Sequence, residues 1–107
     1  IILSQAALYV ATAPKSNACY MAIDKALDVV KNSKTAPVPV HLQDAHYKGS
    51  AKLGHGVGYL YAHDYPNHYV RQQYLPDAYV NEKFYEPGDM GYERDIKKHL
   101  DKIKSEA

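Results

Sequence analysis

The sequence predicts a mainly α-helical single domain of 107 residues, 1–107, built as a helical bundle with a long irregular segment between its helices. Apolar residues recur at spacings of three and four near both ends of the chain, as they do along amphipathic helices. Prolines, glycines and tyrosines gather in the middle, where neither a helix nor a strand period is sustained. A mass of 12.0 kDa is ordinary for one domain with its own core.

Residues 1–34 are expected to form an αα-hairpin. The first helix covers residues 2–12, and Pro14 prevents its continuation. Ser16 or Asn17 can cap a second helix that ends near Asn32. Its small residues allow a close helix neighbour, and its apolar positions share one face: Cys19, Ala22, Ile23, Ala26, Leu27 and Val30.

Residues 35–88 are predicted to be extended or irregular. Pro37 and Pro39 make a stiff connector, because proline restricts the residue before it to extended conformations. A short helix is expected over residues 42–53, followed by glycine turns. From residue 59 to residue 87 we expect packed irregular structure, with one short hairpin as an alternative within it.

A final helix is predicted over residues 89–105. Asp89 can cap it, and Glu93 with Lys97 has the spacing of a favourable ion pair on one helix face. An apolar stripe runs along this helix, made of Tyr92, Ile96, Leu100 and Ile103.

Charge and cysteine content limit the function classes. Thirteen basic and twelve acidic residues leave a net charge of +1, so the total balance demands no polyanionic partner. The single Cys19 excludes an internal disulfide, and its apolar helical surroundings predict a buried, inert thiol in a reducing compartment. The chain starts at Ile1 in apolar helical sequence, so we expect a piece of a longer polypeptide. The start lacks the basic region of a secretion signal, and no stretch is apolar enough to span a bilayer.

No catalytic, cofactor-binding or metal-ligating residue is predicted. His41 and His46, like His63 and His68, are five residues apart, which does not place two imidazoles on one helix face. Gly49 and Gly54 have the spacing of a phosphate-binding loop, but His55 and Gly56 replace its lysine and hydroxyl residue. The serines lack the sequence setting of a nucleophile. We therefore expect that the chain by itself is not an enzyme.

Nucleic-acid binding stays open as an alternative, because aromatic residues interleaved with cations can stack bases and meet phosphates. Residues 41–87 carry four basic and five acidic side chains, which weakens this interpretation, and structural packing of the tyrosines is favoured. The candidate contacts are Tyr47, Lys48, Lys52, Tyr59 and Arg71.

Five ordered motifs resemble the C-terminal region of the RarA/MgsA family of AAA+ ATPases, which act in replication-fork maintenance and are related to the Werner-helicase-interacting protein. The flanking residues at 13–18 and 91–93 resemble the family too, so nearly the whole chain is covered. Gln43 and Val57 depart from the pattern, since these positions are often basic in the family. The motifs are Pro-Val-Pro-Val-His-Leu-Gln-Asp-Ala-His-Tyr-Lys from Pro37, Leu-Gly-His-Gly-x-Gly-Tyr from Leu53, Tyr-Ala-His-Asp-Tyr-Pro from Tyr61, Gln-Tyr-Leu-Pro from Gln73 and Phe-Tyr-Glu-Pro from Phe84.

The resemblance implies a fold like the oligomerisation collar that follows the AAA+ module in clamp loaders, and a homotetramer. It implies that ATP and Mg²⁺ bind in an ATPase domain of the parent protein, a DNA-dependent ATPase of the bacterial cytoplasm and nucleoid. DNA and single-stranded-DNA-binding protein are the parent's expected partners. We therefore expect an oligomerisation and scaffolding domain, with a nucleic-acid or partner-protein binding module as the alternative. The expected interface residues are Ile23, Leu27, Val30, Ile96, Leu100 and Ile103.

Overall fold

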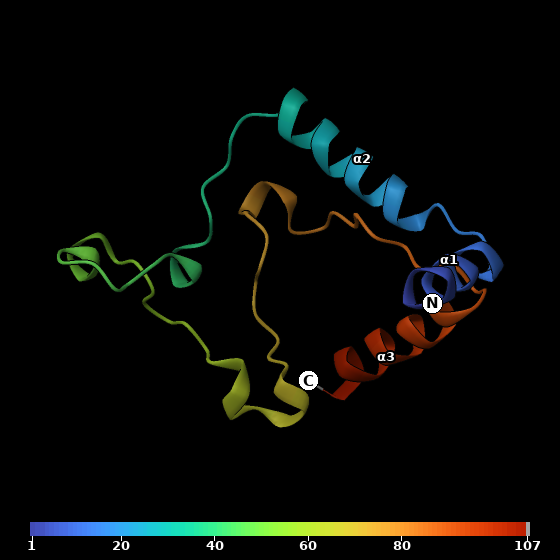
Figure 1. The fold of residues 1–107 in the computed structure, drawn as a ribbon. Helices are drawn as coiled ribbons and strands as arrows, with labels where there is room; N and C mark the ends of the chain where they lie inside the picture. Colours follow the sequence, from blue (N-terminus) through green and yellow to red (C-terminus); the bar gives the residue numbers. More distant parts are fainter. Residues whose placement is uncertain (107) are drawn as a thin grey trace.

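The computed structural model describes residues 1–106. Three α-helices, α1 (Ile2–Thr12), α2 (Ala18–Asn32) and α3 (Tyr92–Glu106), flank a long middle segment that contains only single turns of 3₁₀ helix (Figure 1). No strand occurs among residues 1–106, so the short hairpin considered as an alternative is absent there. The prediction of a mainly α fold is confirmed.

The three helices have nearly the predicted bounds. Ala13 leaves α1 in an extended conformation, as a residue before proline does. At the start of α2 the Ser16 hydroxyl oxygen accepts the N–H of Ala18 at 3.2 Å, while Asn17 makes no side-chain cap. The sequence alone therefore locates the helices, because their apolar spacing and flanking prolines are local signals.

The predicted ion pair between Glu93 and Lys97 is wrong. Lys97 Nζ instead contacts Asp89 Oδ1 at 2.9 Å, where Asp89 was expected to act as a helix cap. Glu93 instead bonds to the segment before α3, since its carboxylate accepts the N–H of Gly88 at 2.7 Å. For both residues, a partner in the segment before α3 has replaced the neighbour on the same helix face.

The helix predicted over residues 42–53 is also wrong. Two separate 3₁₀ turns stand in its place, at Val40–Leu42 and Ser50–Leu53. Between them Asp44 accepts the backbone N–H of His46 at 2.9 Å, which diverts that N–H from helix bonding. Gly49 has a left-handed backbone with φ of 93°, so a continuous right-handed helix is broken there.

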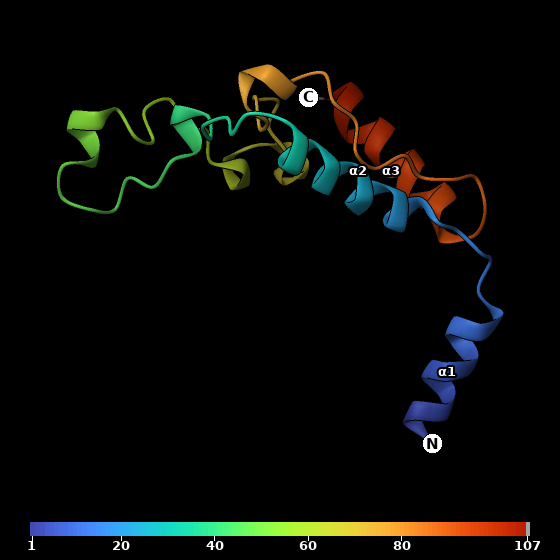
Figure 2. The ribbon, with the colours of Figure 1, turned by 90° about the horizontal axis from the view of Figure 1, so that it is seen from above.

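The described chain has an open shape. Its radius of gyration is 18.4 Å, against about 13 Å for a compact chain of this length. Val70, which is 5 % exposed, is the one buried apolar side chain among residues 1–106. Cys19 is exposed, so the prediction of a buried thiol is wrong. Figure 2 shows α1 pointing away from α2, where an αα-hairpin would have laid the two side by side.

The helices are tied together through the middle segment, since they make few contacts with one another. On α2, Lys25 Nζ contacts Glu82 at 3.1 Å and donates to the carbonyl of Lys83 at 2.6 Å. At the far end of α3, the Arg71 guanidinium donates to the carbonyl of Lys104 at 2.6 Å. A cation at the carbonyl end of a helix is favourable, because it meets unsatisfied oxygens and the negative end of the helix dipole.

A candidate oligomer interface

Helix α1 has the surface of a core helix, although it lies in the open. No charged residue occurs from Ile1 to Pro14. The Ser4 hydroxyl donates to the carbonyl of Ile1 at 2.8 Å and the Thr12 hydroxyl to that of Leu8 at 2.7 Å, so both polar groups are turned to their own backbone. A helix that is apolar all round is normally buried. Six large apolar residues here are nonetheless mostly exposed: Ile1, Ile2, Leu3, Leu8, Tyr9 and Val10.

Helix α2 offers a second exposed apolar surface. Its small residues Ala18, Ala22 and Ala26 are half-buried and face the rest of the chain. Another side carries what we call the α2 stripe, with exposed fractions of 65 % for Tyr20, 56 % for Ile23, 45 % for Leu27 and 76 % for Val30. These four residues are spaced three, four and three apart, which is the spacing of a helix-pairing seam. Val30, at the end of the stripe, also lines a pocket beside the middle segment.

The predicted interface residues on α3 lie differently. Ile96, Leu100 and Ile103 are only half-exposed. Ile103 lines a cavity of about 340 Å³ together with Val70 and Leu60. The structure thus separates the six predicted residues into an exposed α2 set and a partly covered α3 set.

The sequence prediction did not include α1 among the candidate interface elements. The helix was assigned to a hairpin with α2, which would have covered one of its faces. The signal that could have identified it is the absence of any charge over the fourteen residues from Ile1 to Pro14. A partner on one side only would leave an uncharged outer face in water.

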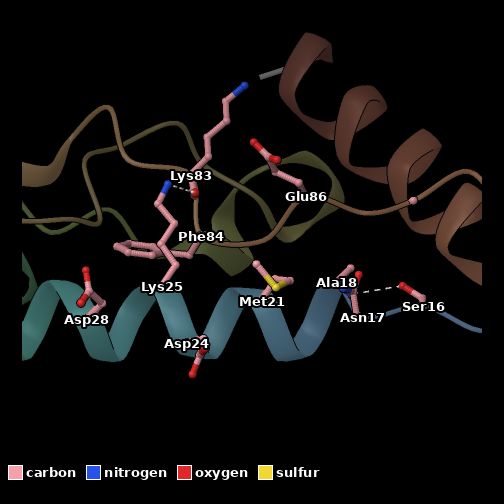
Figure 3. Close-up of a pocket in the computed structure, with 11 residues that line it drawn as sticks. Ser16, Asn17, Ala18, Met21, Asp24, Lys25, Asp28, Lys83, Phe84 and Glu86 are labelled. Carbon is pink, nitrogen blue, oxygen red and sulfur yellow. Dashed lines mark hydrogen bonds between the residues drawn. The ribbon is translucent and has the colours of Figure 1, made fainter.

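A groove lies between α2 and the segment before α3, with a volume of about 670 Å³ (Figure 3). Met21 and Phe84 are its large apolar lining residues, among mostly polar and charged ones. Lys25 crosses it, with its ammonium 5.6 Å from the centre of the Phe84 ring and bonded to the carbonyl of Lys83. The charge of Lys25 is therefore satisfied within the chain, and the groove is suited to binding rather than to proton transfer.

Four of the five predicted nucleic-acid contacts share one projecting lobe, residues 40–61, seen at the far left of Figure 1. Tyr47 and Tyr59 are 43 % and 51 % exposed, and Lys48 and Lys52 are exposed beside them. Arg71 lies outside this lobe, engaged with α3. The two tyrosines and two lysines thus share one lobe, and the arginine lies elsewhere.

The 40–61 lobe is more basic than the middle segment as a whole. Asp44 is its one acidic residue, against Lys48 and Lys52. The backbone N–H of His46, with the imidazole of His46, lowers the pKa of Asp44 below its ordinary value. The Tyr47 hydroxyl is hydrogen-bonded to Nδ1 of His55 at 2.5 Å, which restrains the ring.

Glu93 joins three segments at the base of α1. A hydrogen bond from the Ser16 hydroxyl, followed by the N–H of Gly88, lowers the pKa of the Glu93 carboxyl. The Tyr85 hydroxyl donates to the same carboxylate at 3.3 Å. Burial, together with the nearby carboxylate, raises the pKa of Tyr85. The bonds from Gly88 and Tyr85 fix the segment before α3 against the first turn of that helix.

Residues 1–106 contain no cluster of three or more His, Cys, Asp or Glu side chains arranged to hold a metal ion. Across the same residues, every helix is too short or too polar to cross a bilayer.

Comparison with known proteins gives one family. A family model described as the MgsA AAA+ ATPase C terminal matches residues 1–104. The chain is 44 % identical to replication-associated recombination protein A of Bacillus subtilis, over 96 % of this chain and 25 % of that protein. It is 44 % identical to an uncharacterized AAA domain-containing protein of Mycobacterium tuberculosis, over 98 % of this chain and 23 % of that protein. The ATPase WRNIP1 of Dictyostelium discoideum is 37 % identical over 77 % of this chain and 10 % of its own length.

Proposed function

The chain belongs to the family of MgsA AAA+ ATPase C-terminal domains, and we propose that it is the oligomerisation and scaffolding domain of such an ATPase. The family resemblance seen in the sequence motifs is confirmed by this match. The chain spans about a quarter of the length of its bacterial relatives. Relatives are named for replication-associated recombination. We propose that the whole protein to which this chain belongs acts in the same process.

The observation that carries the proposal is the surplus of exposed surface. The chain exposes 9107 Å², whereas a compact monomer of this mass exposes roughly 6,000 Å². The difference is about 3,000 Å², and a standard interface covers only about 800 Å² on each partner. This surplus is large enough for contacts with more than one neighbour, as a tetramer requires.

The free energy of burying apolar side chains also favours oligomerisation. Covering the six exposed apolar side chains at α1 contributes on the order of 10 kcal/mol, which is comparable to the whole stability of a typical domain. An isolated chain lacks this stabilisation, because these side chains stay in contact with water. Assembly with other copies would bury them, and apolar interfaces of this kind are typical of permanent oligomers.

In this proposal, the catalytic chemistry belongs to another domain of the parent protein. ATP and Mg²⁺ bind to its ATPase module, and this domain holds the subunits in register while performing no catalytic step. DNA and single-stranded-DNA-binding protein are the proposed partners of the whole protein, in the bacterial cytoplasm and nucleoid.

The test is the mass of the chain in solution. Light scattering and sedimentation between 1 and 100 μM are expected to show a species of four 12.0 kDa chains, about 48 kDa, with dissociation only at the lowest concentrations. A strict 12.0 kDa monomer over the whole range contradicts the proposal.

The 40–61 lobe supports a second candidate function, contact with single-stranded nucleic acid. Two exposed tyrosines beside two lysines can stack bases and meet phosphates. A fluorescent oligothymidine is expected to bind with an affinity that falls as salt rises, and Lys48→Ala with Lys52→Ala lowers the logarithmic salt slope by about 1.4. Tyr47→Ala with Tyr59→Ala weakens binding, while Tyr92→Ala, on α3, serves as the matched control. No binding at 20 mM salt dismisses this candidate.

A further inference from the structure

We propose that α1 of one copy packs along the α2 stripe of a second copy, so that two chains exchange their first helices. This inference rests on the proposed oligomerisation and names the elements that carry it. The occupant of the α2 stripe is therefore a second copy of this chain, and the residues of α1 that face it include Leu3 and Val10.

The two surfaces match in length and in chemistry. Helix α1 has 11 residues, which at 1.5 Å per residue is about 16 Å. The α2 stripe, from Tyr20 to Val30, runs for about 15 Å by the same rise. One partner carries no charge, and the other presents a seam of one aromatic and three aliphatic side chains. An uncharged helix fits such a seam without burying an unpaired ion.

The direction of α1 prevents the same contact within one chain. Pro14 packs against Gly91, where an added Cβ would lie 3.0 Å from the proline Cγ. The neighbouring Ser16 hydroxyl lies close enough to the Glu93 carboxyl to lower its pKa. These contacts hold the residues between α1 and α2 against the start of α3, and α1 projects away from α2 (Figure 2). Both surfaces therefore remain open to another copy.

Exchange of α1 gives a closed dimer when the two copies are related by a twofold axis. Each α1 then covers the α2 stripe of the other chain, so the contact occurs twice and leaves no unpaired arm. The sequence favours pairing of these two helices, since both carry apolar faces at adjacent positions in the chain. The exchange satisfies this preference between chains.

A mixing experiment tests the exchange. One variant carries Leu3→Lys and Val10→Lys on α1, and the other carries Ile23→Glu and Leu27→Glu on the α2 stripe. Each variant alone is expected to weaken self-association by about 100-fold or more, while Val57→Lys, an equally exposed site in the 40–61 lobe, leaves it unchanged. An equimolar mixture restores association, because the intact α1 of the second variant meets the intact α2 of the first.

Cross-linking keeps the test decisive if a charged variant loses its fold. In a Cys19→Ser background, chains with Ala7→Cys are mixed with chains with Leu27→Cys and oxidised. The expected product is a covalent heterodimer, formed in excess over the product of a Val57→Cys control.

Three results would overturn the exchange. They are an α2 variant that assembles normally, a mixture with no more association than its components, and a cross-link no stronger than the Val57→Cys control. If the unmodified chain assembles in these cases, only the exchange fails and the proposed function stands. A monomeric unmodified chain refutes both.

Discussion

The substitution Ile23→Ala distinguishes an isolated chain from an assembled one. Removing three carbons from a fully buried isoleucine costs about 2.4 kcal/mol in transfer free energy. Ile23 is 56 % exposed in the single chain, so its own packing accounts for less than half of that, about 1 kcal/mol. If a second copy covers the side chain, the free energy of unfolding falls by 2 to 5 kcal/mol, about the range measured for buried sites.

Urea unfolding followed by circular dichroism, at 1 μM and at 100 μM chain, measures this difference. We expect the loss of stability caused by Ile23→Ala to grow with protein concentration, because mass action adds the interface to the folded state. Val57→Ala, at an exposed site far from the α2 stripe, is expected to cost about 0.5 kcal/mol at both concentrations. A cost for Ile23→Ala of about 1 kcal/mol that does not change with concentration would refute the reasoning.

Three further predictions concern the fold of the chain. Val70→Ala removes two methyl groups from the one buried apolar site of residues 1–106 and is expected to cost about 2 kcal/mol; a change of Tm under 2 °C contradicts it. Because the pKa of Glu93 is lowered in the folded chain, its stabilisation is present above the unfolded pKa of about 4.3 and is lost as pH falls further. The Tm difference between wild type and Glu93→Gln should therefore shrink from pH 6 to pH 3, and a constant difference would count against this role. Gly56→Ala places a Cβ 2.7 Å from Ala45 Cβ, whereas Gly49→Ala meets open space with a similarly positive φ. Hydrogen exchange in the 40–61 lobe should accelerate more for Gly56→Ala, and equal acceleration would contradict the clash.

Helix location could be predicted from the sequence because it depends on neighbours in the chain. The apolar spacing of α2 and the proline after α1 act within a few residues, and the structure follows them. The helix predicted at 42–53 failed because two local features oppose it: the left-handed Gly49 and the bond from His46 N–H to Asp44. Such turn chemistry is weaker in the sequence than apolar periodicity.

The candidate interface could be predicted only in part. The exposed residues Ile23, Leu27 and Val30 were identified, since an apolar face beyond the needs of one domain is visible in the spacing. The residues beside Ile103, such as Leu60 and Val70, belong to a segment with no periodic signal. The direction of α1 depends on long-range contacts of Pro14 and Ser16 that no local pattern encodes.

The anchor of α1 on Gly91 and Glu93 also bears on the order of events during synthesis. Gly91 follows Pro14 by 77 residues, so a nascent chain displays α1 long before the residues that orient it have been made. During that interval the uncharged helix is an exposed apolar segment with no fixed orientation, and such segments are prone to aggregation. The orientation of α1 is fixed only when α3 has formed. This delay leaves α1 open to capture by a neighbouring nascent chain until α3 has been made.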